Sequence, residues 1–309
     1  MGSCVGYLPV ISHVIGVDAG GTKTAAALAT IQDSDIEIIG QITGGPGNPH
    51  KQGPDTAYAN VCDVLNELLI ACDLAADLVK VVYVGMAGCG DSLTQEQARS
   101  FLCDKLGFRH VLVVPDYELV IPQDCKNGSV ALISGTGSVA FGRFGNREAK
   151  SGGQRFNDVG SGSWIANKLV DELIESNFAD KSLWNQTKKA LANDKAKEVC
   201  RQIHLRKIAM PKLAEVVTAE RNRSEMASRI VQDAAKGLAQ LVIQVVSDLK
   251  LNCNRFDIGM GGSVLTQTAT IRNELISQLE SNGIVTQAIS IVKSPERNAI
   301  QLAIRAVKS

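Results

Sequence analysis

The chain has 309 residues, enough for two domains, and 45% of them are hydrophobic while 21% are charged. Its 32 basic and 32 acidic residues balance, so there is no basic excess of the kind that binds nucleic acid. No apolar run approaches the roughly 20 residues that span a bilayer. We therefore expect neither a nucleic-acid partner nor a membrane.

Eight cysteines are scattered through the chain, and they form neither a CxxC pair nor, with the four histidines, a zinc pattern. Scattered cysteines without a signal peptide are typical of reduced thiols, so we expect a cytoplasmic protein. Met1–Gly6 partly matches an acylation signal, but Gly6 stands where that signal has Ser or Thr. We interpret this segment instead as a frayed extension.

The first half of the sequence alternates between strand and helix patterns. Apolar runs predict strands over residues 13–18, 24–30 and 35–42, followed by a Gly/Pro loop at Gly44–Pro49. Apolar residues at helical spacing predict a helix over Asp55–Cys72. The half ends with a strand over Val79–Val84, a helix over Thr94–Leu106 and a strand over His110–Val114.

The second half repeats this order. We predict strands over 129–134, 138–144 and 147–151, a helix after Gly160, a helical stretch over Leu169–Met226, a long helix to about Lys250, a strand over 255–259, a helix over 268–281, a strand over 287–292 and a helix from Pro295. Such a repeat indicates two α/β domains of shared topology. A polar, turn-forming segment at Gln123–Gly128 suggests domains of residues 1–126 and 127–309.

A glycine turn separates the first two predicted strands. Gly20 and Gly21 bring bare backbone N–H groups together, which suits an anion, and Thr22, Lys23 and Thr24 add hydroxyl groups and a positive charge. Asp18, at the strand end beside this turn, is a candidate Mg²⁺ ligand. The alternatives are an ordinary Gly-Gly hairpin, a turn-forming Asp18 and a solvated Lys23.

Glycine turns of this kind recur twice more. Gly135, Thr136, Gly137 and Ser138 lie between two predicted strands, and Gly261, Gly262 and Ser263 precede a predicted helix. That helix would direct its positive end at a nucleotide, although Gly261 and Gly262 could be a plain strand–helix connection. Three such turns predict a nucleotide held from several sides.

These motifs resemble the N-acetylglucosamine kinase family, within the group that includes the BadF/BadG ATPases and the wider actin, Hsp70 and sugar-kinase superfamily. Gly16–Thr24 and Leu132–Ser138 look like its two phosphate motifs, and Met260–Ser263 looks like its adenosine motif. The resemblance runs from about Val14 to the final helix. It implies duplicated ribonuclease-H-like (actin-like ATPase) domains around a nucleotide cleft, and we expect the last helix to pack back toward the N-terminal domain.

The resemblance extends to a sugar site. Asn48 resembles the loop asparagine that touches the sugar, Asp116 resembles the catalytic aspartate, and Gly152, Gly153 and Asp158 resemble the remaining sugar-binding segments. Within Asn157–Ser161, Val159 replaces a glutamate, and Gly152 stands where a tryptophan often lies. We therefore expect a reshaped sugar pocket.

Each of these residues also has a structural interpretation. Asp116 ends the apolar strand Val111–Val114 and suits a general base for an acceptor hydroxyl, but it could cap a helix that begins near Tyr117. Asp158 could likewise cap the helix that contains Trp164, and Asn48 could be a simple turn residue. We interpret Trp164 and Trp184 as packing residues.

The leading hypothesis is a kinase that transfers the ATP γ-phosphate to the 6-hydroxyl of N-acetylglucosamine or glucosamine, with Asp116 as the base and a homodimer as the expected assembly. One alternative is a BadF-type ATPase that activates another enzyme through a cysteine-bound iron–sulfur cluster. No cysteine lies in a glycine-rich inter-domain position suited to such a cluster. Another alternative is a non-catalytic sugar- or nucleotide-binding regulator. Such regulators usually carry an added DNA-binding helix-turn-helix, and we expect none here because the N-terminal extension is too short to form one.

Overall fold

The computed structural model describes residues 11–33, 35–153, 158–193, 195–206, 212–252 and 255–308. It divides into two compact units: unit 1 is Met1–Leu119 together with Ser294–Ser309, and unit 2 is Val120–Lys293. The chain thus enters unit 2 at Val120, whereas the sequence suggested a junction within Gln123–Gly128. The possible acylation signal at Met1–Gly6 lies outside the described residues.

Unit 1 is built on a five-stranded mixed sheet with the order β3-β2-β1-β4-β5. The strands are β1 (Ile11–Ala19), β2 (Thr24–Gln32), β3 (Asp35–Gly44), β4 (Val79–Met86) and β5 (Val111–Pro115). The first three pair antiparallel, while β4 runs parallel to β1 and β5 runs parallel to β4. The carboxyl ends of β1, β4 and β5 therefore meet at one edge, where open α/β sheets bind their ligands.

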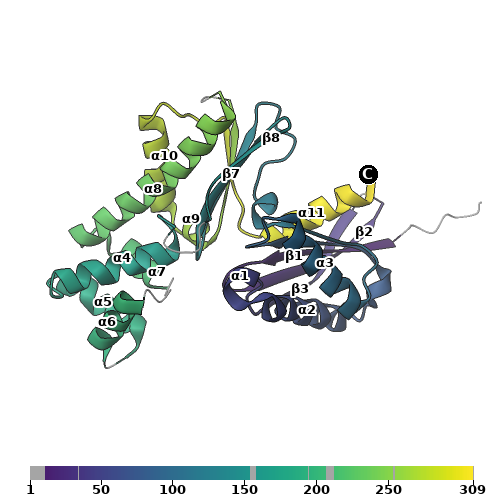
Figure 1. Ribbon diagram of the computed structural model, residues 1–309, viewed down its shortest axis with the longest axis horizontal. Coiled ribbons are helices and arrows are strands. Elements are labelled where there is room, and N and C mark those ends of the chain that lie inside the picture. The colour runs from purple at the N-terminus through teal and green to yellow at the C-terminus, as the bar shows by residue number, and fades with distance from the viewer. Residues whose placement is uncertain are drawn as a thin grey trace, which may run out of the picture. The chain divides into compact units, whose positions relative to one another are not determined.

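Helices cover both faces of this sheet (Figure 1). The helices α2 (Pro54–Ala71) and α3 (Ser92–Leu106) pack on the face that carries Ile15 and Val17. The final helix, α11 (Pro295–Lys308), packs on the opposite face, which carries Val14. Gly16 lies beneath α11, and a Cβ there would overlap the carbonyl oxygen of Glu296 and stand 2.6 Å from the Ile300 nitrogen. Three short elements complete the unit: α1 (Pro49–Gln52), η1 (Ala76–Leu78) and η2 (Asp116–Leu119).

Unit 2 repeats the same sheet, with the order β10-β9-β6-β7-β8. Its strands are β6 (Ser129–Ser134), β7 (Ser138–Phe144), β8 (Arg147–Gly152), β9 (Asp257–Gly261) and β10 (Ala288–Ile291). The strands β6, β7 and β8 pair antiparallel, and β9 and β10 continue the sheet in parallel. The predicted duplication of an α/β fold is confirmed, because the strand order and strand directions of the two units are the same.

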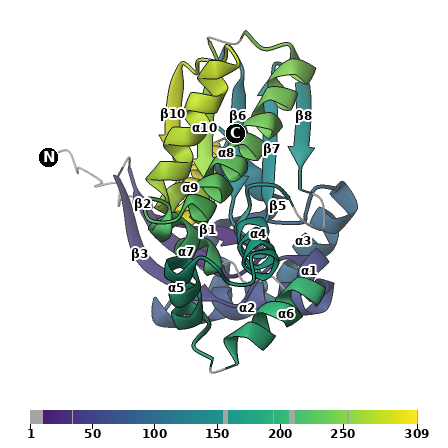
Figure 2. The ribbon, with the colours of Figure 1, turned by 90° about the vertical axis from the view of Figure 1, so that its left-hand side faces the viewer.

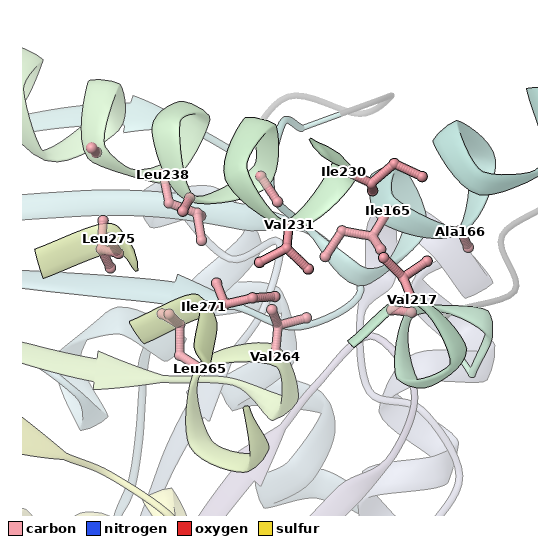
Figure 3. Close-up of a cluster of buried hydrophobic side chains, with 14 of the residues drawn as sticks. Ile165, Ala166, Val217, Ile230, Val231, Leu238, Val264, Leu265, Ile271 and Leu275 are labelled. Carbon is pink, nitrogen blue, oxygen red and sulfur yellow. The ribbon is translucent and has the colours of Figure 1, made fainter. Parts of the chain in front are cut away.

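The core of unit 2 lies between its sheet and its helices. The helices are α4 (Gly162–Glu175), α5 (Lys181–Leu191), α6 (Ala196–Arg206), α7 (Leu213–Glu220), α8 (Glu225–Leu249), α9 (Ser263–Gln267) and α10 (Ala269–Ser281). Figure 2 shows α8 and α10 lying side by side in front of the sheet. In Figure 3, Ile165 of α4, Val231 of α8 and Ile271 of α10 belong to one buried cluster. Trp184 is buried against Phe178, and Trp164 packs on the same core, so both tryptophans are packing residues as predicted.

Two details differ from the predicted elements. The strand β9 begins at Asp257 rather than at residue 255 and extends through Gly261. A short helix, α9, follows at once from Ser263 and precedes the predicted helix at 268–281. A Cβ on Gly261 would stand 2.8 Å from a methyl group of Val120, so this glycine is explained by packing inside the strand rather than by a turn.

Candidate active site

The turn between β1 and β2 is held to two other loops of unit 1. Within the turn, the Gly20 amide donates a hydrogen bond of 2.9 Å to the Lys23 carbonyl. The Gly20 carbonyl accepts a bond of 3.0 Å from the Gly47 amide, and the Ala19 carbonyl accepts one of 2.9 Å from the Ala87 amide. The turn, the Gly/Pro loop and the loop after β4 therefore form one connected structure.

The five residues predicted to bind phosphate here differ in exposure. Thr22 and Lys23 are exposed and Gly20 and Gly21 are half-buried, so these four are accessible to a phosphate. Thr24 is fully buried, and its hydroxyl oxygen would lie 2.9 Å from a Cβ on Gly47. The Thr24 hydroxyl thus lies beneath the Gly/Pro loop, where it packs rather than faces solvent.

Asn48 is the N-cap of α1, because its side-chain oxygen accepts a bond of 2.9 Å from the His50 amide. The same oxygen would lie 2.6 Å from a Cβ on Gly88, in the loop that follows β4. The side-chain oxygen of Asn48 therefore has a local structural role, as the turn interpretation predicted. The position also places the side chain against the loop that follows β4.

Asp116 follows β5 directly and is the first residue of η2. The negative charge of Asp116 adds to the effect of burial in raising the pKa of Asp18. The pKa of Cys89 is raised to about 12, mainly by burial, with smaller contributions from the charges of Asp91 and Asp116. Cys89 is adjacent in sequence to Gly88, which packs against Asn48. Asp18 pairs with Gly85 of β4, and Pro115, the residue before Asp116, pairs with Met86. The end of β4 and the loop after it therefore lie beside Asp18, Asn48 and Asp116 at one edge of the unit 1 sheet.

Asp18 carries the strongest electrostatic perturbation among these residues. Burial raises its pKa from 3.8 to about 7, the negative charges of Asp116 and Glu296 add to the rise, and Lys23 opposes it. A divalent cation would relieve this excess of negative charge, so the residue suits the predicted Mg²⁺ ligand. Among the described residues no group of three His, Cys, Asp or Glu side chains could hold a metal ion alone. Mg²⁺ at Asp18 would take its other ligands from water and phosphate, as it prefers.

The turn between β6 and β7 has a matching set of contacts in unit 2. The Gly135 amide donates to the Gly137 carbonyl at 2.9 Å, and the Gly162 amide donates to the Gly135 carbonyl at 2.7 Å. The Ser134 hydroxyl donates to the Gly160 carbonyl at 2.8 Å, and the Ser138 hydroxyl donates to the Val159 carbonyl at 2.9 Å. The second predicted phosphate turn is thereby fixed against the segment that precedes α4.

Asp158 lies on this turn, where one of its carboxylate oxygens accepts a bond of 3.4 Å from the Ser138 amide. The same oxygen would stand 3.2 Å from a Cβ on Gly137. The alternative role of Asp158 as the N-cap of α4 is wrong, because Ser161 caps that helix by accepting from the Trp164 amide at 3.1 Å. Asn157 of the same motif lies outside the described residues.

Gly152 and Gly153 lie on the other side of the β6–β7 turn. The Gly153 amide donates to the Ser138 carbonyl at 2.8 Å, and a Cβ on Gly152 would stand 2.8 Å from that carbonyl oxygen. Both glycines have positive φ angles, 80° and 73°, which favour glycine. A tryptophan at position 152 would therefore need a different backbone path, so its absence is part of the local structure.

The third glycine turn joins the same cluster. A Cβ on Gly262 would overlap the Ser134 carbonyl and stand 2.8 Å from the Gly135 nitrogen, and a Cβ on Gly135 would lie 3.8 Å from the Ser263 nitrogen. Unit 2 therefore brings together predicted residues from several segments: Gly135–Ser138, Gly152 with Gly153, Asp158, and Gly262–Ser263.

The structure also shows residues that the motifs did not indicate. In unit 1 these are Glu296, whose charge reaches Asp18, and Lys51, whose ammonium group lies at Gly21. In unit 2, Gly237 of α8 lies under the Val159 side chain. The sequence signal for Gly237 was a glycine in the middle of a predicted helix. Glycine destabilises a helix interior, so its presence there indicates a packing reason outside the helix.

Two α/β units of identical topology, each with a glycine turn between its first two strands, define the fold class of the actin-like ATPases and sugar kinases. The solved structures agree with this fold. A Chromobacterium violaceum protein provisionally named an N-acetylglucosamine kinase matches with a TM-score of 0.68 at 17% identity, over 94% of this chain and 99% of that one. The ROK hexokinase of Thermus thermophilus matches with a TM-score of 0.55 at 14% identity, over 96% and 100%.

The family model described as the BadF/BadG/BcrA/BcrD ATPase family matches residues 15–300. The chain belongs to this family. A curated relative, the N-acetylmuramic acid/N-acetylglucosamine kinase of Clostridium acetobutylicum, is 24% identical over 310 residues, which are 95% of this chain and 98% of the relative. Within the described residues, none of the helices combines the length and apolarity that crossing a bilayer requires.

Proposed function

We propose that the protein is an ATP-dependent amino-sugar kinase that phosphorylates the 6-hydroxyl of N-acetylglucosamine or glucosamine. Membership of an ATPase family and the kinase relatives support the coarser part, a phosphotransferase that uses ATP and a sugar acceptor. For the finer part, the choice of sugar rests on the names of those relatives, and the choice of base rests on the position of Asp116 near Asn48 in unit 1.

The observation that carries the proposal is the convergence of these two residues on one loop. Asn48 packs against Gly88 in the loop that follows β4, and Asp116 follows Pro115, which pairs with Met86 at the end of β4. An amide and a carboxylate at the carboxyl ends of neighbouring strands suit the hydroxyl groups of a sugar. The β1–β2 turn, which is hydrogen-bonded to the loop of Asn48, supplies bare amides for a phosphate.

The chemistry assigned to these residues is general base catalysis. Asp116 accepts the proton of the sugar hydroxyl while the hydroxyl oxygen forms a bond to the γ-phosphorus and the bond to the bridging oxygen of ADP breaks. Bound Mg²⁺ supplies positive charge to the phosphates, and Asp18 is the residue that would hold it. In unit 2, Asp158 is a second polar group for the sugar, and the β6–β7 turn is a second cradle for phosphate.

The test is a panel of sugars and amino sugars assayed for ADP formation, with the product examined by nuclear magnetic resonance to locate the phosphate. We expect ADP formation to depend on N-acetylglucosamine or glucosamine and the phosphate to be on O6. ATP hydrolysis that no sugar accelerates would contradict the proposal.

That contrary result would favour the second candidate, an ATPase that activates another enzyme, because the family is named for ATPases. Visible absorption from an iron–sulfur cluster in the purified protein would support this candidate further. We also propose a cytoplasmic homodimer. Light scattering on the purified protein tests the dimer, and a mass of 32.9 kDa, that of one chain, would contradict it.

A further inference from the structure

The end of the Lys51 side chain lies beside Gly21 in the first glycine turn. A Cβ added to Gly21 would stand 3.3 Å from the Lys51 ammonium nitrogen, 3.6 Å from its Cδ and 3.7 Å from its Cε. The distal part of the lysine side chain therefore lies in contact distance of the place that a Cβ at position 21 would take. The ammonium group lies against the backbone that the sequence assigns to a phosphate.

The short helix α1 determines this position. Asn48 caps the helix, and the Lys51 and Gln52 amides both donate to the Asn48 carbonyl at 3.1 Å. One residue before the cap, the Gly47 amide donates to the Gly20 carbonyl at 3.0 Å. A segment of five residues, 47–51, thus holds the glycine turn at one end and places a lysine over it at the other.

The same segment indicates which phosphate would meet Lys51. In phosphoryl transfer the terminal phosphate must lie beside the acceptor hydroxyl. Asn48, the proposed sugar ligand, belongs to the segment that carries Lys51 and is bound to the β1–β2 turn. The terminal phosphate is therefore the part of the nucleotide closest to this turn, and Lys51 adds a second cation to that of Lys23.

We propose that Lys51 binds the terminal phosphate of ATP and makes the protein distinguish ATP from ADP. This inference rests on the proposed function, since it requires a nucleotide at the β1–β2 turn. A lysine ammonium group is a compact positive charge with three donors, well suited to a phosphate whose charge shifts during transfer. Lys51 is exposed, so its removal is not expected to disturb folding.

The test compares nucleotide binding by calorimetry, with Mg²⁺, for a non-hydrolysable ATP analogue and for ADP. Lys51→Met keeps the length of the side chain and removes its charge. We expect this variant to bind the ATP analogue about tenfold more weakly, the range of one charge-assisted hydrogen bond, while its ADP affinity changes less than about twofold. Lys51→Arg should retain most of the affinity for the analogue.

The control is Lys80→Met, because Lys80 is also exposed but lies near the start of β4, at the opposite end of that strand from the loop beside Asn48. This variant should bind both nucleotides as the wild type does. Wild-type affinity of Lys51→Met for the ATP analogue, or an equal loss for the analogue and ADP, would overturn the inference. Absence of nucleotide binding by the wild type would instead overturn the proposed function.

Discussion

The side chain of Val159 fills the space that a side chain at position 237 would occupy. A Cβ on Gly237 would overlap one methyl group of Val159 and stand 2.8 Å from its Cβ. Other residues of α8 also pack against the segments that contain Gly152 and Gly160. A Cβ on Gly160 would stand 2.6 Å from the Ala234 carbonyl oxygen, and a Cβ on Gly152 would stand 3.2 Å from the Leu241 side chain. The helix α8 is therefore the support on which the segment with Asp158 rests.

This contact predicts that Gly237→Ala weakens binding of the acceptor. The added methyl group must displace Val159 and with it Asp158, and we expect the acceptor KM to rise by about tenfold, in line with the cost of misplacing a substrate ligand. Helix propensity favours alanine at this position by about 1 kcal/mol and offsets part of the cost of displacing Val159, so the melting temperature should fall little compared with the loss of affinity. The measurement is steady-state kinetics with varied sugar and varied ATP.

The matched control for Gly237→Ala is a double-mutant cycle with Val159→Ala, which removes the overlapping methyl group. The double variant should recover part of the lost acceptor affinity. Gln240→Ala, an exposed substitution on the same helix, should leave the acceptor KM unchanged. Equal acceptor KM values for Gly237→Ala and the wild type would show that α8 does not position Asp158.

Asp116→Asn tests the proposed base, because the amide keeps the shape of the carboxylate but cannot accept the proton. We expect turnover to fall about a hundredfold or more. Affinities for sugar and ATP should change little, since the amide still forms hydrogen bonds. Calorimetry and single-turnover kinetics separate these effects. Near-normal turnover in Asp116→Asn together with an inactive Asp158→Asn would move the base to Asp158.

Substitutions of different side-chain size at Gly135 test whether the second glycine turn binds phosphate. A Cβ there would be in ordinary contact with its neighbours, 3.8 Å from the Ser263 nitrogen, so Gly135→Ala should bind ATP almost normally. Gly135→Leu should bind ATP at least about tenfold more weakly, because a bulky side chain keeps the phosphates from the backbone amides. Unchanged ATP affinity in Gly135→Leu, measured on a variant with wild-type melting temperature, would remove the nucleotide from this turn.

The raised pKa of Asp18 predicts that the free energy of unfolding depends on pH. The folded-state pKa of about 7 exceeds the ordinary value of 3.8, so between these pH values the folded state holds a proton that the unfolded state has released. Stability at this site is therefore greatest below pH 4, falls as pH rises toward 7 and is constant above it. Asp18→Asn should be more stable than the wild type by about 1–2 kcal/mol at pH 8 and equal to it near pH 4.

Denaturant unfolding without nucleotide or Mg²⁺ checks this dependence, because a bound cation would lower the pKa of Asp18. The exposed Asp63→Asn on α2 is the control and should shift stability little at either pH. A stability difference between Asp18→Asn and the wild type that does not vary between pH 4 and pH 8 would contradict the assigned titration.

Much of the fold was predictable because its signals are local. Apolar alternation and helical spacing gave every strand and the long helices, and the repeat of their order predicted two units with the same sheet. The short helix α9 was missed because five residues carry no periodicity. The strand β9 was placed too early because Gly259 and Gly261 are typical of a turn, whereas both make room for the Val120–Pro122 segment.

The candidate site residues that the sequence indicated lie in contiguous motifs, and their roles stay predictions. The structure brings the second and third glycine turns together with Asp158 in unit 2, and it joins the first glycine turn to the Gly/Pro loop in unit 1. Glu296 could not be found this way, because its effect on Asp18 exists only when α11 packs on Gly16. The support of Val159 by Gly237 likewise depends on the packing of a distant helix.

The division of the chain has a consequence for synthesis. Unit 2 is one continuous segment inserted into unit 1, and the helix α11 that completes unit 1 is synthesised after unit 2. Until then, the face of the unit 1 sheet that carries Val14, Ala27 and Val81 lacks its covering helix, while unit 2 is already complete. On the ribosome, the half that begins first should therefore finish folding last, and its uncovered apolar face is a natural target for chaperones during that interval.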